Sequence, residues 1–252
     1  MGVFMIDIHN HALYGIDDGA QTIEEAIELL QQAKQQGIEQ IILTPHYVLD
    51  GSYYAPKDKV IELINSLDGY AKELDITLHT GHELFIHRDL CERLKNNKCC
   101  TLADSKYILV EFPFDHYDDE YDYILEDLRS LGYKIIIAHP ERYQYVRKNL
   151  NFCLRWLDEG DLLQCNQNSF LRKENKKMMK KMVNHGFISF IASDAHGKRR
   201  PNALGDVYQM IADTYGEDMA KQLCYTNAQA IIDKQEIINE EYTPIRNIFG
   251  KY

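Results

Sequence analysis

The sequence predicts a single-domain α/β protein with the architecture of a distorted (β/α)7 TIM-like barrel, and three observations lead to this fold class. Seven short apolar runs of strand length recur along the 252 residues, and longer amphipathic stretches separate most of them. Strands that alternate with helices favour right-handed βαβ units, and seven consecutive units favour a closed or nearly closed barrel. Histidines and acids follow the apolar runs, as expected for a barrel whose site lies at the C-terminal ends of its strands.

The predicted strands are mostly rich in isoleucine and valine and are bounded by turn residues. They span residues 3–8, 40–44, 76–80, 107–110, 134–138, 161–165 and 188–192. No apolar run approaches the roughly 18 residues that a membrane span requires. Because the N-terminal residues also lack the pattern of a signal peptide, we expect a cytoplasmic protein without membrane insertion.

The first predicted helix begins after Thr22, where Thr22 and Glu25 form a capping box, and ends before Gly37. Pro56 suits the first turn of the second helix, which runs to about residue 74. The other helical patterns cover residues 119–131, 150–159, 173–185, 203–215 and 218–234. We therefore assign residues 1–234 to the barrel domain and residues 235–252 to a C-terminal tail that is partly ordered on the barrel.

Charge and cysteine usage exclude several classes of function. A formal net charge of −11 argues against nucleic acid as the main partner, because such proteins usually present a basic surface. The six cysteines form no CxxC pair, and Cys99 and Cys100 are adjacent, so neither a disulfide framework nor a zinc knuckle is indicated. We expect reduced and mostly buried thiols.

Candidate metal ligands lie at or after the predicted strands. His9 and His11 are two residues apart at a strand end, so both imidazoles point the same way, and Asp194 and His196 repeat this spacing. The full set is His9, His11, Asp18, His46, Glu83, Glu111, His139, Asp194 and His196. Mixed imidazole and carboxylate ligands suit Zn, Mn or Fe, and nine ligands predict two or three ions. Asp17 is an alternative to Asp18, because DDG is also a common turn.

This ligand set predicts metal-assisted hydrolysis of a phosphoester by direct attack of metal-bound hydroxide, because clustered metals activate water and clamp the oxygens around phosphorus. Phosphate also needs cationic donors, and arginine binds it bidentately. We predict Arg142 and Arg200 as the phosphate clamps, with Arg199 as the alternative to Arg200. A thiol mechanism needs Cys-x5-Arg, and the nearest case, Cys165 with Arg172, is one residue too long.

The chain resembles the PHP (polymerase and histidinol phosphatase) superfamily, and within it the bacterial protein-tyrosine phosphatases of capsule and exopolysaccharide operons. The resemblance covers nearly the whole chain and is carried by MIDIHNHALYGIDDGAQTIEEA, TPHY, GHE, VEF, IAHPERY, QCNQNS and IASDAHG. It implies a distorted barrel of parallel strands that holds three metals, often manganese. The SDAHGKRRP segment is shorter between His and Arg than in some members, which leaves Arg199 and Arg200 open.

The resemblance also implies how the ligands are shared and what the protein acts on. One metal would be bound by His9, His11, Glu83 and Asp194, a second by Glu83, Glu111 and His139, and a third by Asp18, His46 and His196. Arg142 and Arg200 match the phosphate-binding arginines. The implied substrate is a tyrosine-phosphorylated protein, namely a membrane tyrosine autokinase that regulates polysaccharide export.

Two other functions stay open from the sequence. A small-molecule phosphatase, such as histidinol-phosphate phosphatase, would keep the same metals but enclose its substrate in a closed pocket. A non-catalytic metal-binding partner domain is disfavoured by the complete ligand set. An amidohydrolase barrel also begins with HxH, but the two strand-end glutamates and the lack of an obvious bridging lysine weigh against it. The sequence leaves the oligomeric state open.

Overall fold

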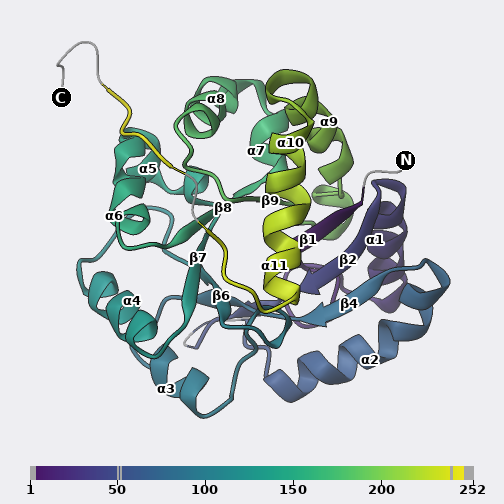
Figure 1. Ribbon diagram of the computed structural model, residues 1–252. Helices are drawn as coiled ribbons and strands as arrows, with labels where there is room; N and C mark the ends of the chain where they lie inside the picture. Colours follow the sequence, from purple (N-terminus) through teal and green to yellow (C-terminus); the bar gives the residue numbers. More distant parts are fainter. Residues whose placement is uncertain (1–3, 50, 52, 239–240, 247–252) are drawn as a thin grey trace.

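The computed structural model describes residues 4–49, 51, 53–238 and 241–246, and in these residues parallel strands form two sheets inside a layer of helices (Figure 1). The strands are β1 (Met5–Asn10), β2 (Ile38–Leu43), β3 (His46–Tyr47), β4 (Thr77–Thr80), β5 (Glu83–Phe85), β6 (Tyr107–Glu111), β7 (Lys134–Ala138), β8 (Leu162–Asn166) and β9 (Phe190–Ala192). One sheet has the order β1-β2-β4, and the other has the order β3-β5-β6-β7-β8-β9.

The two sheets follow one another around a single ring. Only two residues separate β2 from β3, and two separate β4 from β5, so each pair continues one strand direction. The backbone N–H of Glu83 donates to the carbonyl of Pro45 (3.1 Å) where the two sheets meet. On the other side, the N–H of Asp194 donates to the carbonyl of His9 (2.8 Å) and joins the end of β9 to β1. The predicted parallel α/β barrel is confirmed, and its distortion is this division into two sheets.

The helices surround the strands (Figure 1). They are α1 (Ile23–Gln35), α2 (Lys57–Glu73), α3 (Leu90–Lys95), α4 (Glu120–Ser130), α5 (Gln144–Lys148), α6 (Leu154–Leu157), α7 (Gln167–Leu171), α8 (Lys176–Asn184), α9 (Leu204–Tyr215), α10 (Glu217–Lys221) and α11 (Asn227–Ile232). The helices predicted over 150–159 and 173–185 begin as 3₁₀ turns, and the one over 218–234 contains a π-helical turn. The helices α3, α5 and α7 were not predicted, because each has only five or six residues and so shows little periodicity.

Side-chain alternation along the strands separates an inner core from an outer core and prepares the site. In β6, Tyr107 and Leu109 pack in the inner apolar cluster, whereas Ile108 and Val110 pack in the cluster that includes the outer helices. The next residue on the inner face is Glu111. The strands β7, β8 and β9 show the same alternation. Apolar side chains therefore fill the start of the barrel, and polar side chains occupy its C-terminal end.

The helix α11 packs on the opposite end of the barrel, and the chain after it continues past Tyr107 toward Asn151. Ala228 and Ile231 of α11 belong to the inner cluster, and Figure 1 shows α11 crossing in front of the strands. Beyond it, the N–H of Ile237 donates to the hydroxyl of Tyr107 (2.8 Å), and the N–H of Ile245 donates to the side chain of Asn151 (2.8 Å). Residue 3 of the first predicted strand and residues 239–240 and 247–252 of the predicted tail lie outside the described residues. No described helix has the length and hydropathy of a membrane span.

The N-terminus of α1 has the predicted cap. Thr22 is extended, and its hydroxyl accepts the N–H of Glu25 at 3.3 Å. The carboxylate of Glu25 accepts the N–H of Gln21 (2.8 Å), one residue before the position that a capping box uses. Gly37 follows the helix with a φ of 83°, as its predicted role as a terminator requires.

Replacing Thr22 with alanine is expected to lower the free energy of unfolding by about 1 kcal/mol, because one N–H at the helix start loses its acceptor. Urea denaturation followed by circular dichroism measures this change. Thr22→Ser keeps the hydroxyl and is the matched control, and it should stay within a few tenths of a kcal/mol of the parent protein. Equal losses in the two variants would show that the hydroxyl does not cap the helix.

Candidate metal centre

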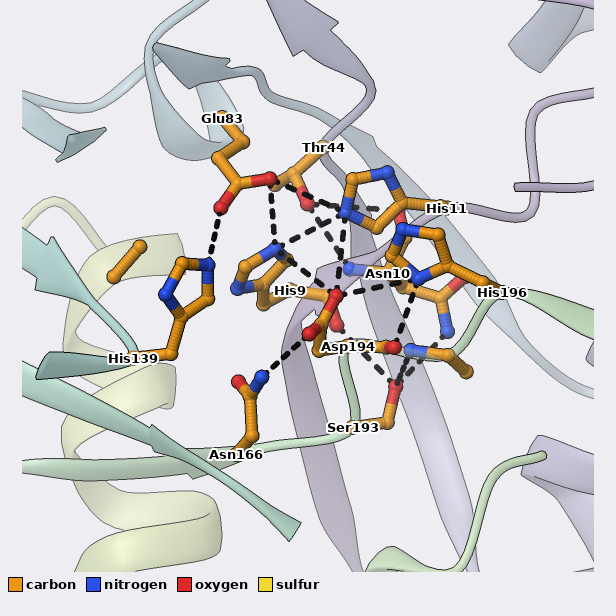
Figure 2. Close-up of polar contacts among 12 residues, drawn as sticks. His9, Asn10, His11, Thr44, Glu83, His139, Asn166, Ser193, Asp194 and His196 are labelled. Atoms are coloured by element: carbon orange, nitrogen blue, oxygen red, sulfur yellow. Dashed lines mark hydrogen bonds and ion pairs between the residues drawn. The ribbon is translucent and has the colours of Figure 1, made fainter. Parts of the chain in front are cut away.

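The structure brings all nine predicted ligands together at the C-terminal end of the barrel, and Figure 2 shows six of them facing one another. His9, Glu83 and Glu111 lie within strands β1, β5 and β6, and His46 begins β3. The remaining ligands, His11, Asp18, His139, Asp194 and His196, lie on loops that directly follow strands. Four of the side chains are therefore held by strands, and the other five are held by the loops that follow strands.

The first group of donor atoms surrounds Glu83 Oε2 between β1 and β5. The Nε2 atoms of His9 and His11 are 3.1 Å apart and lie 3.3 and 3.5 Å from this oxygen. Asp194 Oδ1 lies 3.6 Å from both nitrogens. Two atoms bound at about 2.1 Å to one ion lie roughly 3 to 3.5 Å apart, so these four side chains have the spacing of a shared metal site.

The second group lies around Glu83 and Glu111. His46 Nδ1 is 2.9 Å from Glu83 Oε2 and 3.7 Å from Glu111 Oε2. His139 Nε2 is 2.8 Å from the other Glu83 oxygen and 3.5 Å from Glu111 Oε1. Glu83 thus faces nitrogen atoms of both groups, as a carboxylate shared by two cations would.

The third group has Asp18 at its centre. Asp18 Oδ1 lies 3.3 Å from the Nε2 atoms of both His46 and His196. His11 belongs to the same group of potential ligands, and its ring stacks on that of His196 with centroids 3.8 Å apart. His46 presents Nδ1 to the second group and Nε2 to the third, so one imidazole connects the two.

Several buried nitrogen and oxygen atoms of the candidate ligands have no hydrogen-bond partner among the described residues. They are His46 Nδ1, Glu83 Oε2, His139 Nδ1 and His196 Nε2. Buried polar atoms normally find a partner, because an unpaired one is costly. Three of these four atoms face the donor groups described above. The donor set and these unpaired atoms fit cations held between the side chains.

The electrostatics of the cluster also favour positive charge. Burial raises the pKa of Glu111 to about 8, and the negative charge of Glu83 adds to this rise. Burial lowers the pKa of His46, but Glu83, Asp18 and Glu111 outweigh it and raise the value to about 12. Burial also opposes protonation of His11, and the carboxylate of Asp17 helps to raise its pKa to about 9. The carboxylates therefore stabilise cations at this position.

Side chains behind the imidazoles fix their orientation. Gln164 Oε1 lies 2.8 Å from His9 Nδ1, and Asp17 Oδ2 lies 2.7 Å from His11 Nδ1. These contacts leave the Nε2 atoms of both rings facing the cluster, an arrangement common around metal-bound histidines. Asp17 also accepts the N–H of His46 at 3.1 Å. Asp17 therefore lies behind His11, whereas Asp18 faces the donor atoms.

Both predicted arginines reach the edge of the cluster. Arg142 Nη1 and Arg200 Nη1 donate to Asp194 Oδ2 at 3.2 and 2.8 Å, and both residues line a hollow of about 480 Å³. The guanidinium of Arg142 also lies 4.6 Å from the ring centroid of Phe114. Arg199 is exposed and is absent from the lining of this hollow. Arg200, unlike Arg199, therefore borders the hollow beside the cluster.

The comparison with known families agrees with this site. The family described as "Capsular polysaccharide synthesis, CpsB/CapC" matches residues 5–233. The chain belongs to the CpsB/CapC family. Its relatives include the tyrosine-protein phosphatase YwqE of Bacillus subtilis strain 168, which is 33% identical over 254 residues that cover 98% of this chain and 99% of YwqE. The tyrosine-protein phosphatase CpsB of Streptococcus pneumoniae is 32% identical over 244 residues, covering 92% of this chain and 100% of CpsB.

A solved structure places the fold in the same CpsB/CapC group. It comes from work on YwqE of Bacillus subtilis and CpsB of Streptococcus pneumoniae, described as unique metal-dependent tyrosine phosphatases. It superposes with a TM-score of 0.90 and 30% sequence identity over 96% of this chain and 100% of that chain. The resemblance that the motifs indicated is therefore confirmed.

The thiols of this CpsB/CapC chain lie away from the donor cluster. All six cysteines are free, and all but Cys91 are buried. Burial raises the pKa of Cys99 and Cys100 to about 12 and also raises the pKa of Cys165. Cys165 lies in β8 on the face opposite Gln164, in the outer core. Because a nucleophilic cysteine needs a lowered pKa, none of these thiols suits a phosphatase mechanism.

Two polar residues of β8, Gln164 and Asn166, belong to the site but were not predicted as site residues. The side chain of Asn166 donates to Asp194, and Gln164 contacts His9 (Figure 2 labels Asn166). The carboxylate of Glu141 is buried and accepts the N–H of Asn166 at 2.9 Å. The signal in the sequence was two polar residues with strand spacing in LLQCN, on a face that is otherwise apolar.

Asp7 holds together the loops that carry the HxH and SDAH motifs. Its carboxylate accepts the N–H of Ser193 (2.9 Å), the hydroxyl of Ser193 (2.5 Å) and the side-chain N–H of Asn10 (2.9 Å). Asp7 is fully buried, so these bonds are protected from water. The network joins β1 to the end of β9 beside His9 and Asp194.

Proposed function

We propose that this chain is a metal-dependent protein-tyrosine phosphatase. The observation that carries the proposal is the convergence of nine imidazole and carboxylate side chains, with two arginines at their edge, in a chain of the CpsB/CapC family. Relatives named tyrosine-protein phosphatases match almost the entire chain, and this favours phosphotyrosine over other phosphoesters. The alternatives are a histidinol-phosphate phosphatase and a non-catalytic metal-binding domain, and one kinetic comparison distinguishes all three functions.

The proposed cofactor is Mn²⁺, with Fe or Zn as alternatives, in two or three ions per chain. Mixed nitrogen and oxygen donors suit all three metals. The proposed ligands are His9, His11, Asp18, His46, Glu83, Glu111, His139, Asp194 and His196. Such ions supply a water of lowered pKa and positive charge for the phosphoryl oxygens. Gln164 and Asp17 would keep the Nε2 atoms of His9 and His11 directed at them.

The proposed role of Arg142 and Arg200 is to bind the phosphoryl group of the substrate. Both guanidinium groups border the 480 Å³ hollow beside Asp194, where an incoming phosphate would meet them. Planar guanidinium groups bind phosphate oxygens in pairs, which orients the phosphorus toward the metal centre. With every cysteine placed away from this hollow, the reaction should proceed without a phosphocysteine intermediate.

Aromatic side chains at the rim suit an aromatic phosphoester. Phe114 is 39% exposed and stacks on His139, and Tyr53 is 37% exposed and stacks on His46. A tyrosyl ring entering between them would meet apolar faces beside the charged cluster. The proposed substrate is a tyrosine-phosphorylated protein, specifically a membrane tyrosine autokinase of capsule synthesis. The proposed location of the phosphatase is the cytoplasm.

The test compares kcat/KM of the Mn²⁺-loaded protein for a phosphotyrosine peptide and for histidinol phosphate at matched concentrations. The proposal expects clear preference for the phosphotyrosine peptide and loss of turnover in excess chelator. Preference for histidinol phosphate would assign the chain to small-molecule phosphatases. Absence of turnover with either substrate in the metal-loaded protein would support a binding role.

Replacing Arg142 with lysine is expected to lower kcat/KM for the phosphotyrosine peptide by about tenfold or more, because lysine keeps the charge but loses the bidentate geometry. Steady-state kinetics and inhibition by inorganic phosphate measure the effect, and phosphate should inhibit the variant more weakly. Arg199→Lys is the matched control, because Arg199 is exposed outside the hollow. Parental kinetics in Arg142→Lys would remove Arg142 from phosphate binding.

A further inference from the structure

A second hollow adjoins the one that borders the candidate metal centre. The first has a volume of about 480 Å³ and includes Arg142, Asp194 and Arg200 in its lining. The second has a volume of about 620 Å³ and lies between α5, α8 and the C-terminal segment. Arg147 and Glu174 line both. The two hollows therefore border one another along these two side chains.

Cationic side chains dominate this double hollow, although the chain as a whole has a formal net charge of −11. They are Arg142, Arg147, Lys148, Arg172, Lys177, Lys181 and Arg200, whereas the acids of the lining are Glu174 and Asp194. Among the described residues, Lys148, Lys177 and Lys181 of the second hollow have no acid within ion-pair distance. The local charge is thus opposite to that of the whole molecule. Arg142 and Arg200 pair with Asp194 in the first hollow, whereas the three lysines of the second hollow are not paired with an acid among the described residues.

Arg147 is held in a fixed position at the boundary between the hollows. Its Nη1 donates to the carbonyl of Glu141 (3.1 Å), and both Nη1 and Nη2 lie 3.1 Å from Oδ1 of Asn175. Asn175 is buried, which restrains the arginine. Both acceptors are neutral, so the positive charge of Arg147 stays available to a ligand.

The second hollow also offers apolar surface. Leu150 and Met178 are partly buried in its lining, and Ile245 is buried there. Figure 1 shows α5 and α8 at the end of the molecule where the described C-terminal segment passes. A hollow lined by cationic and apolar side chains suits an acidic polypeptide segment, because such a segment presents both carboxylates and apolar side-chain atoms.

We propose that the second hollow binds an acidic segment of the same polypeptide that carries the phosphotyrosine, so that the two hollows form one substrate groove. This inference rests on the proposed phosphatase function and specifies its substrate class. An acidic peptide is repelled by the overall charge of −11 and needs a local cationic track to approach the site. A free small phosphoester would occupy the first hollow alone and has no use for the second.

The helix α8 provides a matched pair of variants. Lys177 and Lys181 line the second hollow, whereas Lys176 and Lys180 lie on the same helix, are exposed and are absent from both linings. Lys177→Glu/Lys181→Glu therefore reverses charge in the groove, and Lys176→Glu/Lys180→Glu makes the same change in net charge outside it. Each is tested in the full chain with Mn²⁺, using two phosphotyrosine peptides whose flanking residues are either Glu or Gln.

The parent protein is expected to favour the Glu-flanked peptide in kcat/KM, with a preference that weakens as salt increases. Lys177→Glu/Lys181→Glu should reduce the ratio of kcat/KM for the Glu peptide over the Gln peptide by on the order of tenfold. Lys176→Glu/Lys180→Glu should keep the parental ratio. If all three proteins show the same ratio, the second hollow does not bind the acidic segment and the groove proposal is wrong. The phosphatase function would still stand in that case, provided that both peptides are hydrolysed. Failure to hydrolyse either peptide would instead count against the proposed function.

Discussion

Replacing Asp194 with asparagine is expected to lower kcat toward a phosphotyrosine peptide by on the order of a thousandfold or more. The carboxylate of Asp194 faces His9 and His11 on one side and receives Arg142 and Arg200 on the other. Asparagine removes the negative charge that would bind the metal beside the two histidines and that pairs with the two arginines. Asp194 has a φ of 50°, and asparagine tolerates this left-handed conformation, so the backbone should remain in place.

Two measurements separate this effect from misfolding. Circular dichroism should show a folded Asp194→Asn variant, and elemental analysis should show less bound metal than in the parent protein. Asp213→Asn is the control, because Asp213 lies on α9 and contacts Gln209 away from the donor cluster. A folded Asp194→Asn variant with parental turnover would remove Asp194 from the catalytic site.

Exhaustive chelation should destabilise the protein as well as inactivate it. Without cations, the carboxylates of Glu83 and Glu111 lie close together in a buried site, and burial with mutual repulsion raises the pKa of Glu111. A ligand that binds only the folded state stabilises it by about 4 kcal/mol at a thousandfold excess over Kd. For a domain of this size, this corresponds to a fall in Tm of roughly 10 °C on metal removal.

Differential scanning calorimetry measures this change, and added Mn²⁺ should restore both Tm and turnover. Asp194→Asn is the internal control, because a protein that has already lost metal affinity should shift less with chelator. A Tm unchanged by chelation in the parent protein would contradict the coupling between metal binding and folding.

The convergence of the candidate ligands was predictable because strand geometry links sequence spacing to side-chain direction. His9 and His11 are two residues apart, and Glu111 lies two residues beyond Leu109 on the inner face of β6. Parallel strands then bring these ends to one side of the barrel. The fold was predictable from the apolar runs themselves, because parallel strands that are buried on both faces form nearly continuous apolar runs.

Other features depend on tertiary contacts that sequence spacing does not encode. Asp17 and Asp18 are adjacent acids, and only the turn before Gly19 determines which one faces the cluster. Arg199 and Arg200 are likewise adjacent, and only the local backbone determines that Arg200 lines the hollow and Arg199 does not. The division of the barrel into two sheets also escaped the strand pattern, since it depends on short breaks before His46 and Glu83. Short helices such as α5 were missed because five residues span little more than one turn and show no repeat of the apolar pattern. The helix α5 nevertheless carries Arg147 of the proposed groove.

The proposed phosphatase function requires a polynuclear metal centre, and anomalous diffraction from crystals grown with Mn²⁺ tests for this centre most directly. Data collected near the manganese absorption edge should show at least two anomalous peaks, each surrounded by several of the nine proposed ligands. At least one peak should lie beside Glu83, which faces two donor groups. Absence of any peak in this cluster, in crystals of a protein that is active with Mn²⁺, would contradict the proposed metal centre.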